Sequence, residues 1–193
     1  ALRSQSDFPI LRSAMDKPLS LPLGLALAVA VGADATAQDR VHVVVAATTD
    51  LQGRAYHWDY LNDREAPWGL TRVATIVDSL RAAYPGQVIL LDAGDVIQGS
   101  PFATFFATEQ EADPHPVIDA LNAVGYDVAT PGNHDFDFGA AIYGKAVTGA
   151  AFPIVSGNVF RMPRDTFAFQ PHVVLNRSGV KVGITGFTTP GTM

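Results

Sequence analysis

The sequence predicts an α/β domain in which buried strands alternate with amphipathic helices. Two short apolar runs, 41–47 and 87–91, are typical of strands buried on both faces. Between them, apolar residues recur at helical spacing over 70–80, and the Pro85-Gly86 pair ends that helix. This order of elements favours helices packed on a mainly parallel sheet, which defines the fold class.

The same alternation continues along the chain. A second helix is expected over 116–124, followed by a short strand over 126–129. Later strands are expected over 152–156, 171–176 and 180–186, with a hairpin turn joining the last two. No internal repeat or second domain is evident in the sequence.

Composition narrows the chemistry that the chain can perform. The 193 residues include 13 Lys and Arg against 19 Asp and Glu, 48% hydrophobic residues and no cysteine. The apolar content is too high for a disordered acidic tail, and a net charge of −6 does not favour a nucleic-acid polymer as partner. Without cysteine there is no disulfide, no thiolate ligand and no thiol nucleophile. Catalysis would therefore depend on Asp, Asn, His and hydroxyl groups.

The first 37 residues are predicted to be a leader and signal peptide, and residues 38–193 the folded part. The apolar run 19–31 is too short to span a membrane and suits the hydrophobic region of a signal peptide. Ala35-Thr36-Ala37 has the small-residue pattern of a cleavage site. A buried core helix is the alternative, but Pro22 would interrupt it. We therefore expect a secreted, periplasmic or cell-surface protein with no transmembrane span after cleavage.

Polar residues follow the carboxyl ends of three predicted strands. Ligands bind at this edge of an α/β sheet because its loops can converge without disturbing the core. A single Asp in such a place is usually a turn residue, whereas three successive polar loops favour a metal or acid–base site. The residues concerned are Asp50, Gln52, Asp92, Asp95, Asn133, His134 and Asp135.

Three segments carry a family resemblance. TTDLQGR (48–54), LDAGDVIQG (91–99) and GNHDFD (132–137) resemble the first three motifs of calcineurin-like metallophosphoesterases. The match is most similar to the branch of secreted 5′-nucleotidases and cyclic-nucleotide phosphodiesterases, and it covers about residues 41–190. It implies a layered α/β/β/α sandwich that is incomplete in this chain, with 38–193 as the N-terminal part of the catalytic domain.

The resemblance implies a site with two divalent metal ions, which could be Zn, Mn, Mg or Ca. Asp50 would bind the first metal, Asp95 would bridge both, and Asn133 would bind the second through its amide oxygen. His134 would face the phosphate, so that Asn133 and His134 contact the substrate. Asp137 would orient the His134 imidazole and favour its protonated form.

Two departures from the family pattern affect this site. Gln52 occupies the position of a metal-binding His, which predicts a weaker first site or one that prefers harder metals than zinc. The family's remaining His ligands would lie beyond Met193, and the sequence context of the other histidines is that of strand, loop or turn residues: His42, His57, His115 and His172. We therefore expect a piece of a larger enzyme that exposes apolar surface when isolated and is inactive alone.

Several neighbouring residues are expected to play structural parts. Asp92 is expected to brace its turn and Asp135 to support its loop. Tyr56, Trp58 and Tyr60 could form a stacking platform, but packing in the core or at its rim is the preferred interpretation.

The function predicted from these residues is hydrolysis of small phosphate esters by a dinuclear metal site, with a 5′-nucleotidase foremost. The alternatives are a cyclic-nucleotide phosphodiesterase or a sugar-nucleotide hydrolase. From another class, Gln52 favours a non-catalytic module that binds phosphate compounds or a partner. The sequence leaves the oligomeric state open.

Overall fold

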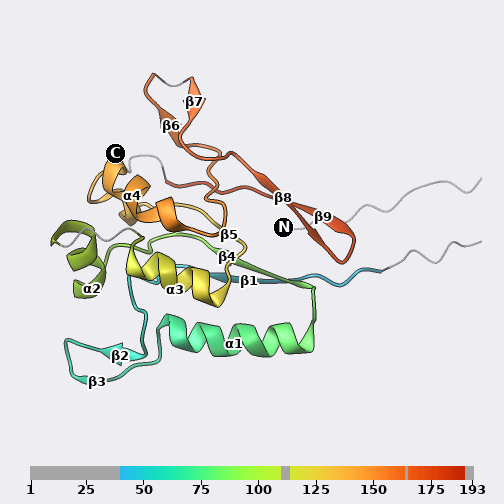
Figure 1. Ribbon diagram of the computed structural model, residues 1–193, viewed down its shortest axis with the longest axis horizontal. Helices are drawn as coiled ribbons and strands as arrows, with labels where there is room; N and C mark the ends of the chain where they lie inside the picture. The colour runs from blue at the N-terminus through green and yellow to red at the C-terminus, as the bar shows by residue number, and fades with distance from the viewer. Residues whose placement is uncertain (1–39, 110–113, 164, 190–193) are drawn as a thin grey trace, which may run out of the picture. The chain divides into compact units, whose positions relative to one another are not determined.

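A three-stranded parallel sheet carries the polar loops. In the computed structural model, which describes residues 40–109, 114–163 and 165–189, the strands are β1 (Val44–Thr48), β4 (Val88–Asp92) and β5 (Val128–Ala129). Their order is β1-β4-β5, so that β4 is central (Figure 1). Both pairs are parallel, and all three strands therefore end at the same edge. A parallel bridge from Ala129 to Ile154 continues the sheet beyond β5.

Two helices pack beside one another on this sheet, as predicted. α1 (Leu70–Ala83) contacts both β4 and α3 (Pro116–Val124) (Figure 1). α3 begins after His115, whose Nδ1 accepts a hydrogen bond from the Val117 amide at 3.3 Å. It ends at Gly125, whose φ of 78° is the left-handed conformation that glycine adopts without a Cβ clash. The apolar faces of both helices join one core cluster.

The remaining elements are short. They comprise the antiparallel pairs β2 (Trp58–Asp59) with β3 (Arg64–Glu65), β6 (Phe160–Arg161) with β7 (Thr166–Phe167), and β8 (Val173–Arg177) with β9 (Val180–Ile184), together with α2 (Pro101–Thr104), the π-helix η1 (Phe105–Glu109), the 3₁₀ helices η2 (His134–Phe136) and η3 (Val147–Gly149), and α4 (Ala140–Ala146). The sequence predicted only β8 and β9 among these.

The β8–β9 hairpin turns where expected, and Arg177 joins it to the parallel sheet. The Gly179 amide donates to Asn176 Oδ1 at 3.1 Å inside the turn. Arg177 Nε donates to the Val88 carbonyl at 3.0 Å, and its guanidinium pairs with Asp127. The other oxygen of Asp127 accepts from the Leu90 amide at 2.9 Å, so one ion pair connects the hairpin, β4 and the loop before β5.

Two strand predictions are corrected by the structure. β4 is buried on both faces, but β1 is not: alternate residues are exposed, and Val45 is 58% exposed. The reason is that β1 is an edge strand of this sheet, and the described residues cover only one of its faces. The expected strand over 152–156 is reduced to single bridges at Ile154 and Val155.

The α/β class is confirmed, and apolar surface is exposed as expected, with Val45, Val174 and Phe187 each more than half exposed. The predicted signal peptide lies outside the described residues. Within the described ranges, no helix is long and apolar enough to cross a membrane.

Candidate metal and phosphate site

The three polar loops are joined by short hydrogen bonds at the carboxyl edge of the sheet. The Asp50 amide donates to the Gly94 carbonyl at 3.0 Å, and the Gln52 amide donates to the Asp95 carbonyl at 2.8 Å. Asp95 Oδ1 in turn accepts from the His134 amide at 2.8 Å. The loop of Asp95 therefore lies between the other two and contacts both.

Two glycines permit this close approach. A Cβ on Gly94 would lie 2.0 Å from the Gly132 amide nitrogen, and one on Gly132 would lie 2.2 Å from Asp95 Oδ1. Both distances are far inside van der Waals contact, so any side chain would separate the second and third loops. Gly94 also has a φ of 97°, which residues with a Cβ rarely adopt.

The backbone is strained at the candidate ligands themselves. Asp50, Gln52 and Asp95 have φ angles of 54°, 49° and 62°, in the left-handed region. Such conformations cost of order 1 kcal/mol or more for non-glycine residues and cluster at functional sites. Three such left-handed residues on two adjoining loops indicate a functional site at this edge of the sheet.

Asp135 connects the second and third loops through hydrogen bonds to backbone amides of both. Its side chain is completely buried. Oδ1 accepts from the amides of Val96 and Ile97 at 2.7 and 3.0 Å, and Oδ2 accepts from those of Asp95 and Gly132, each at 2.9 Å. Burial raises the pKa of Asp135, while these four N–H groups oppose the rise. The expected supporting part of Asp135 is confirmed.

Asp92 braces the turn that precedes Asp95, as expected. Its Oδ1 accepts from the Gly94 amide at 2.8 Å, and its Oδ2 accepts from the Thr48 hydroxyl at 2.6 Å. The side chain is buried, and burial raises the pKa of Asp92 to about 7 although the Thr48 bond opposes the rise. The Thr48 hydroxyl also lies 2.8 Å from that of Tyr126, so one polar network connects the ends of β1 and β4 to the start of β5.

His134 and Asp137 form a pair at the surface of the third loop. His134 Nδ1 lies 2.9 Å from Asp137 Oδ2, and both side chains are nearly half exposed. The hydrogen bond to Asp137 raises the pKa of His134, and the charges of Asp95 and Asp50 add to the rise. Because Nδ1 is engaged, Nε2 is the nitrogen that can meet a ligand.

Gln52 is held by a neighbouring cation. Its Oε1 accepts from Arg54 Nη1 at 3.0 Å. The rest of the side chain lies against Gly99, where a Cβ would come within 2.9 Å of Gln52 carbons. The amide oxygen that would bind a metal thus accepts a hydrogen bond from a guanidinium, whose positive charge disfavours a second cation beside it.

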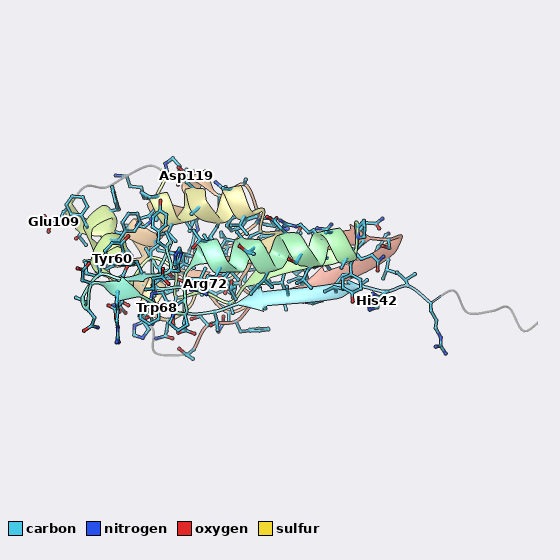
Figure 2. The ribbon with its side chains drawn as sticks, turned by 90° about the horizontal axis from the view of Figure 1, so that it is seen from below. His42, Tyr60, Trp68, Arg72, Glu109 and Asp119 are labelled. Atoms are coloured by element: carbon cyan, nitrogen blue, oxygen red, sulfur yellow. The ribbon has the colours of Figure 1, made fainter. Side chains whose placement is uncertain are left out.

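Three of the other histidines contact residues outside the three loops. Figure 2 shows His42 near the start of β1, at the opposite end of the molecule from Tyr60, and its Nδ1 lies 3.2 Å from Gln87 Oε1. His115 is buried as the cap of α3, and burial lowers its pKa. His57 Nδ1 lies 3.4 Å from the Thr71 hydroxyl.

The donor set of the three loops is rich in oxygen. Asp50 and Asp95 supply carboxylates, and Asn133 supplies an amide. Asn133 comes between Gly132 and His134 in the sequence, and both of these residues contact Asp95. Such donors suit hard divalent cations. Among the described residues, no three His, Cys, Asp or Glu side chains are grouped closely enough to hold a metal. The ligand assignments at the three loops therefore stay predictions.

One feature beside these loops was not predicted. Tyr56, Trp58 and Tyr60 do not fill the core but line a pocket of about 360 Å³ together with Phe102. In the sequence, the pocket could have been anticipated from the three aromatic residues at every second position, Tyr56, Trp58 and Tyr60, just after the first motif.

Comparison with known proteins identifies the chain's relatives. The model of the calcineurin-like phosphoesterase family matches residues 43–191. The chain is 34% identical over 177 residues to the "Trifunctional nucleotide phosphoesterase protein YfkN" of Bacillus subtilis, covering 83% of this chain and 12% of that protein. It is 35% identical over 173 residues to the "2′,3′-cyclic-nucleotide 2′-phosphodiesterase/3′-nucleotidase" of Haemophilus influenzae, covering 83% of this chain and 26% of that protein.

The fold has solved counterparts. The crystal structure of the calcineurin-like phosphoesterase YfkN from Bacillus subtilis superposes with a TM-score of 0.73 at 34% identity, covering 79% of this chain and 50% of that chain. This chain spans only a minor part of the length of the two curated relatives named above.

Proposed function

Since this chain belongs to the calcineurin-like phosphoesterase family, we propose that residues 38–193 are the N-terminal part of the catalytic domain of a secreted or periplasmic phosphate-ester hydrolase. The observation that carries the proposal is the contact of both outer loops with Asp95. It places two carboxylates, one amide and one His–Asp pair at one edge of the sheet. These are oxygen donors that suit divalent cations, beside an acid–base pair of the kind used in phosphoester hydrolysis.

Enzymes of this family use divalent metals. In the proposed site Asp50 would hold the first metal, Asp95 would contribute to both, and Asn133 would hold the second. Gln52 would be the least favourable of these ligands, because its oxygen accepts a hydrogen bond from the Arg54 guanidinium. When bound, the metals supply Lewis acidity and lower the pKa of a coordinated water. The oxygen donors present fit this group but do not complete its shell, so further ligands must come from elsewhere in the protein.

His134 carries the proposed acid–base chemistry. Its Nδ1 proton is directed to Asp137, which leaves an N–H at Nε2 when the ring is protonated. The hydrogen bond to Asp137 raises the pKa of His134 and so favours the protonated ring. It can donate to the negative charge that develops on the phosphate and can pass its proton to the departing alkoxide.

The proposed substrate is a nucleotide, with release of phosphate from a 5′-nucleotide as the foremost activity. A 2′,3′-cyclic nucleotide is the second candidate, because the Haemophilus influenzae relative named for that activity is 35% identical. Nothing in the site favours a nucleic-acid polymer. A non-catalytic phosphate-binding module remains the competing class, with Gln52 in its favour.

The test is phosphate release from adenosine 5′-monophosphate and opening of 2′,3′-cyclic AMP by the complete protein, with Mn²⁺ or Zn²⁺ added. His134→Ala is expected to lower kcat about 10²- to 10⁴-fold. Asp137→Asn should lower it less and move the pH profile to lower pH, because the imidazolium loses its partner. His172→Ala, an exposed residue outside the three loops, is the control. Activity undiminished by His134→Ala would refute the assignment, and a protein that binds the nucleotides without turnover would support the competing class.

A further inference from the structure

A fourth loop with a polar side chain lies at the same edge of the sheet as the three loops of the site. A parallel bridge joins Ile154 to Ala129 of β5, and the Val155 amide donates to the Ala129 carbonyl at 2.9 Å. Because the chain runs here in the same direction as β5, Asn158 follows at the carboxyl edge of the sheet. The chemistry described above does not use Asn158.

The side-chain amide of Asn158 binds the main chain of Thr188 through both of its polar atoms. Nδ2 donates to the Thr188 carbonyl at 2.6 Å, and Oδ1 accepts from the Thr188 amide at 3.0 Å. Oδ1 also accepts from the hydroxyl of Ser156, a fully buried residue, at 3.2 Å. Since both lone pairs of Oδ1 are engaged, the Asn158 amide takes the place of a peptide group in a β-ladder and is not available as a metal ligand.

The segment held by Asn158 lies against the start of the third loop. The Gly186 carbonyl accepts from the Gly157 amide at 2.8 Å. A Cβ on Gly186 would lie 2.2 Å from Thr130 Oγ1, so the main chain of this segment contacts the Thr130 side chain directly. The Thr130 amide also donates to the Asp92 carbonyl at 3.0 Å, and the next residue, Pro131, is fully buried. The first residues of the third loop are thus confined by the end of β4 and by Gly186.

The threonine side chains at this contact do not fix it. The hydroxyls of Thr130 and Thr188 are both buried, and neither has a hydrogen-bond partner within the part of the chain that the structure describes. The bonds that hold the segment 186–188 to the fourth loop are therefore the two from the Asn158 amide and the one between Gly157 and Gly186. Asn158 supplies the side-chain part of this attachment.

We propose that Asn158 is a positioning residue, which fixes the third loop by holding the segment 186–188 against it. The third loop carries Asn133 and His134, and the proposal rests on the function proposed for them above. Asn158 itself contacts neither substrate nor metal. A displacement of about 1 Å at a reacting group costs on the order of 10²-fold in rate, so a contact that fixes this loop affects turnover from a distance.

The first test measures the loop without requiring turnover. In the complete protein, Asn158→Ala should lower the protection of the Thr188 amide against hydrogen exchange about five- to hundredfold, the usual effect of losing two hydrogen bonds. The amides of Gly132 and His134, which bond to side chains of the site, should also lose protection, at least about fivefold. Unchanged protection of Gly132 and His134 would overturn the proposal.

Arg177→Ala is the matched control for this test. Arg177 also joins the β8–β9 hairpin to the sheet, but it donates to the carbonyl of Val88, the first residue of β4, at the opposite edge. The variant should lower thermal stability and leave both kcat and the protection of Gly132 and His134 unchanged. An equal loss of protection at these two amides would show that the third loop responds to any lost contact, and would overturn the proposal.

The second test restores the contact within a single variant. In Asn158→Asp an ionised carboxylate places an oxygen against the Thr188 carbonyl, whereas the protonated carboxyl donates to it as the amide does. Relative to the unmodified protein at the same pH, protection of Thr188 and His134 should be low at about pH 7 and recover at about pH 4. The same ratio at both pH values would mean that the side chain serves only to fill space, which would overturn the proposal. This variant decides alone if Asn158→Ala does not fold.

Turnover separates this inference from the proposed function. Asn158→Ala should lower kcat for adenosine monophosphate about ten- to hundredfold, and should change KM less, because the loop is displaced rather than removed. If the complete protein hydrolyses no phosphate ester with any metal, the proposed hydrolase fails, and the protection of Gly132 and His134 still decides the part of Asn158. If hydrolysis depends on His134 but Asn158→Ala keeps full kcat, the positioning role fails alone.

Discussion

Replacement of Asp135 tests whether one buried carboxylate holds the site together. Its two oxygens accept four backbone N–H groups from the second and third loops. In Asp135→Asn, one oxygen becomes an NH₂ group, so whichever way the amide turns, two of the four N–H groups face a donor. A buried donor left without an acceptor costs about 1–3 kcal/mol, which gives at least about 2 kcal/mol for the pair.

This cost should appear as local opening of the loops. Hydrogen exchange of the backbone amides of Asp95, Val96 and Ile97, measured by NMR or mass spectrometry, should accelerate at least about thirtyfold in Asp135→Asn. Asp135→Ala removes both oxygens and should accelerate exchange further. Activity should fall in parallel, because Asp95 and His134 belong to the loops that separate.

The matched control is Asp78→Asn on the exposed face of α1, which changes the charge equally and breaks no buried contact. Its exchange pattern over the same three amides should equal that of the unmodified protein. Unchanged exchange at Asp95, Val96 and Ile97 in Asp135→Asn would show that the loops are held by other contacts, and the account of Asp135 would be wrong.

Three further predictions concern the same edge of the sheet. Gly132→Ala should abolish metal-dependent activity in turnover assays, because its Cβ would lie 2.2 Å from Asp95 Oδ1. Gly144→Ala is the control, because Gly144 lies within α4 with open space around it. Thermal melting should show that Gly144→Ala stabilises the protein by up to about 1 kcal/mol. Burial raises the pKa of Asp92 to about 7, so between pH 4 and pH 7 the folded state keeps a proton that the unfolded chain has released. The stability of the metal-free protein should therefore fall by roughly 3 kcal/mol over this range. Asp92→Asn should remove this part of the pH dependence in urea unfolding, and an unaltered pH profile would contradict it. Gln52→His should tighten Zn²⁺ binding in calorimetry, and equal affinity would show that this position is not a ligand.

Apolar patterning predicted the main elements because each is decided locally. The helix expected over 70–80 is α1 at Leu70–Ala83, and the helix expected over 116–124 is α3. The strand expected over 87–91 is buried on both faces as β4. The same pattern failed for β1, because burial of a strand depends on what covers it, and hydrophobicity alone does not reveal an edge.

The short elements escaped prediction for a related reason. β2 and β3, β6 and β7 are two residues long, which is below the length at which periodicity can be read. Tyr56, Trp58 and Tyr60 were expected to pack in the core or at its rim because aromatic residues are usually buried, but they line an open pocket.

The sequence by itself determined which chemical groups are available in this protein: which loops follow strands, and which of them carry carboxylate, amide and imidazole groups. These features are local, because residue type, turn chemistry and spacing are read along the chain. Only the tertiary structure decided that Asp135 bonds four amides, that Arg54 engages Gln52, and that Asp95 contacts both outer loops. Those contacts join residues up to 43 positions apart, and which of many possible partners meet is settled only when the whole sheet packs.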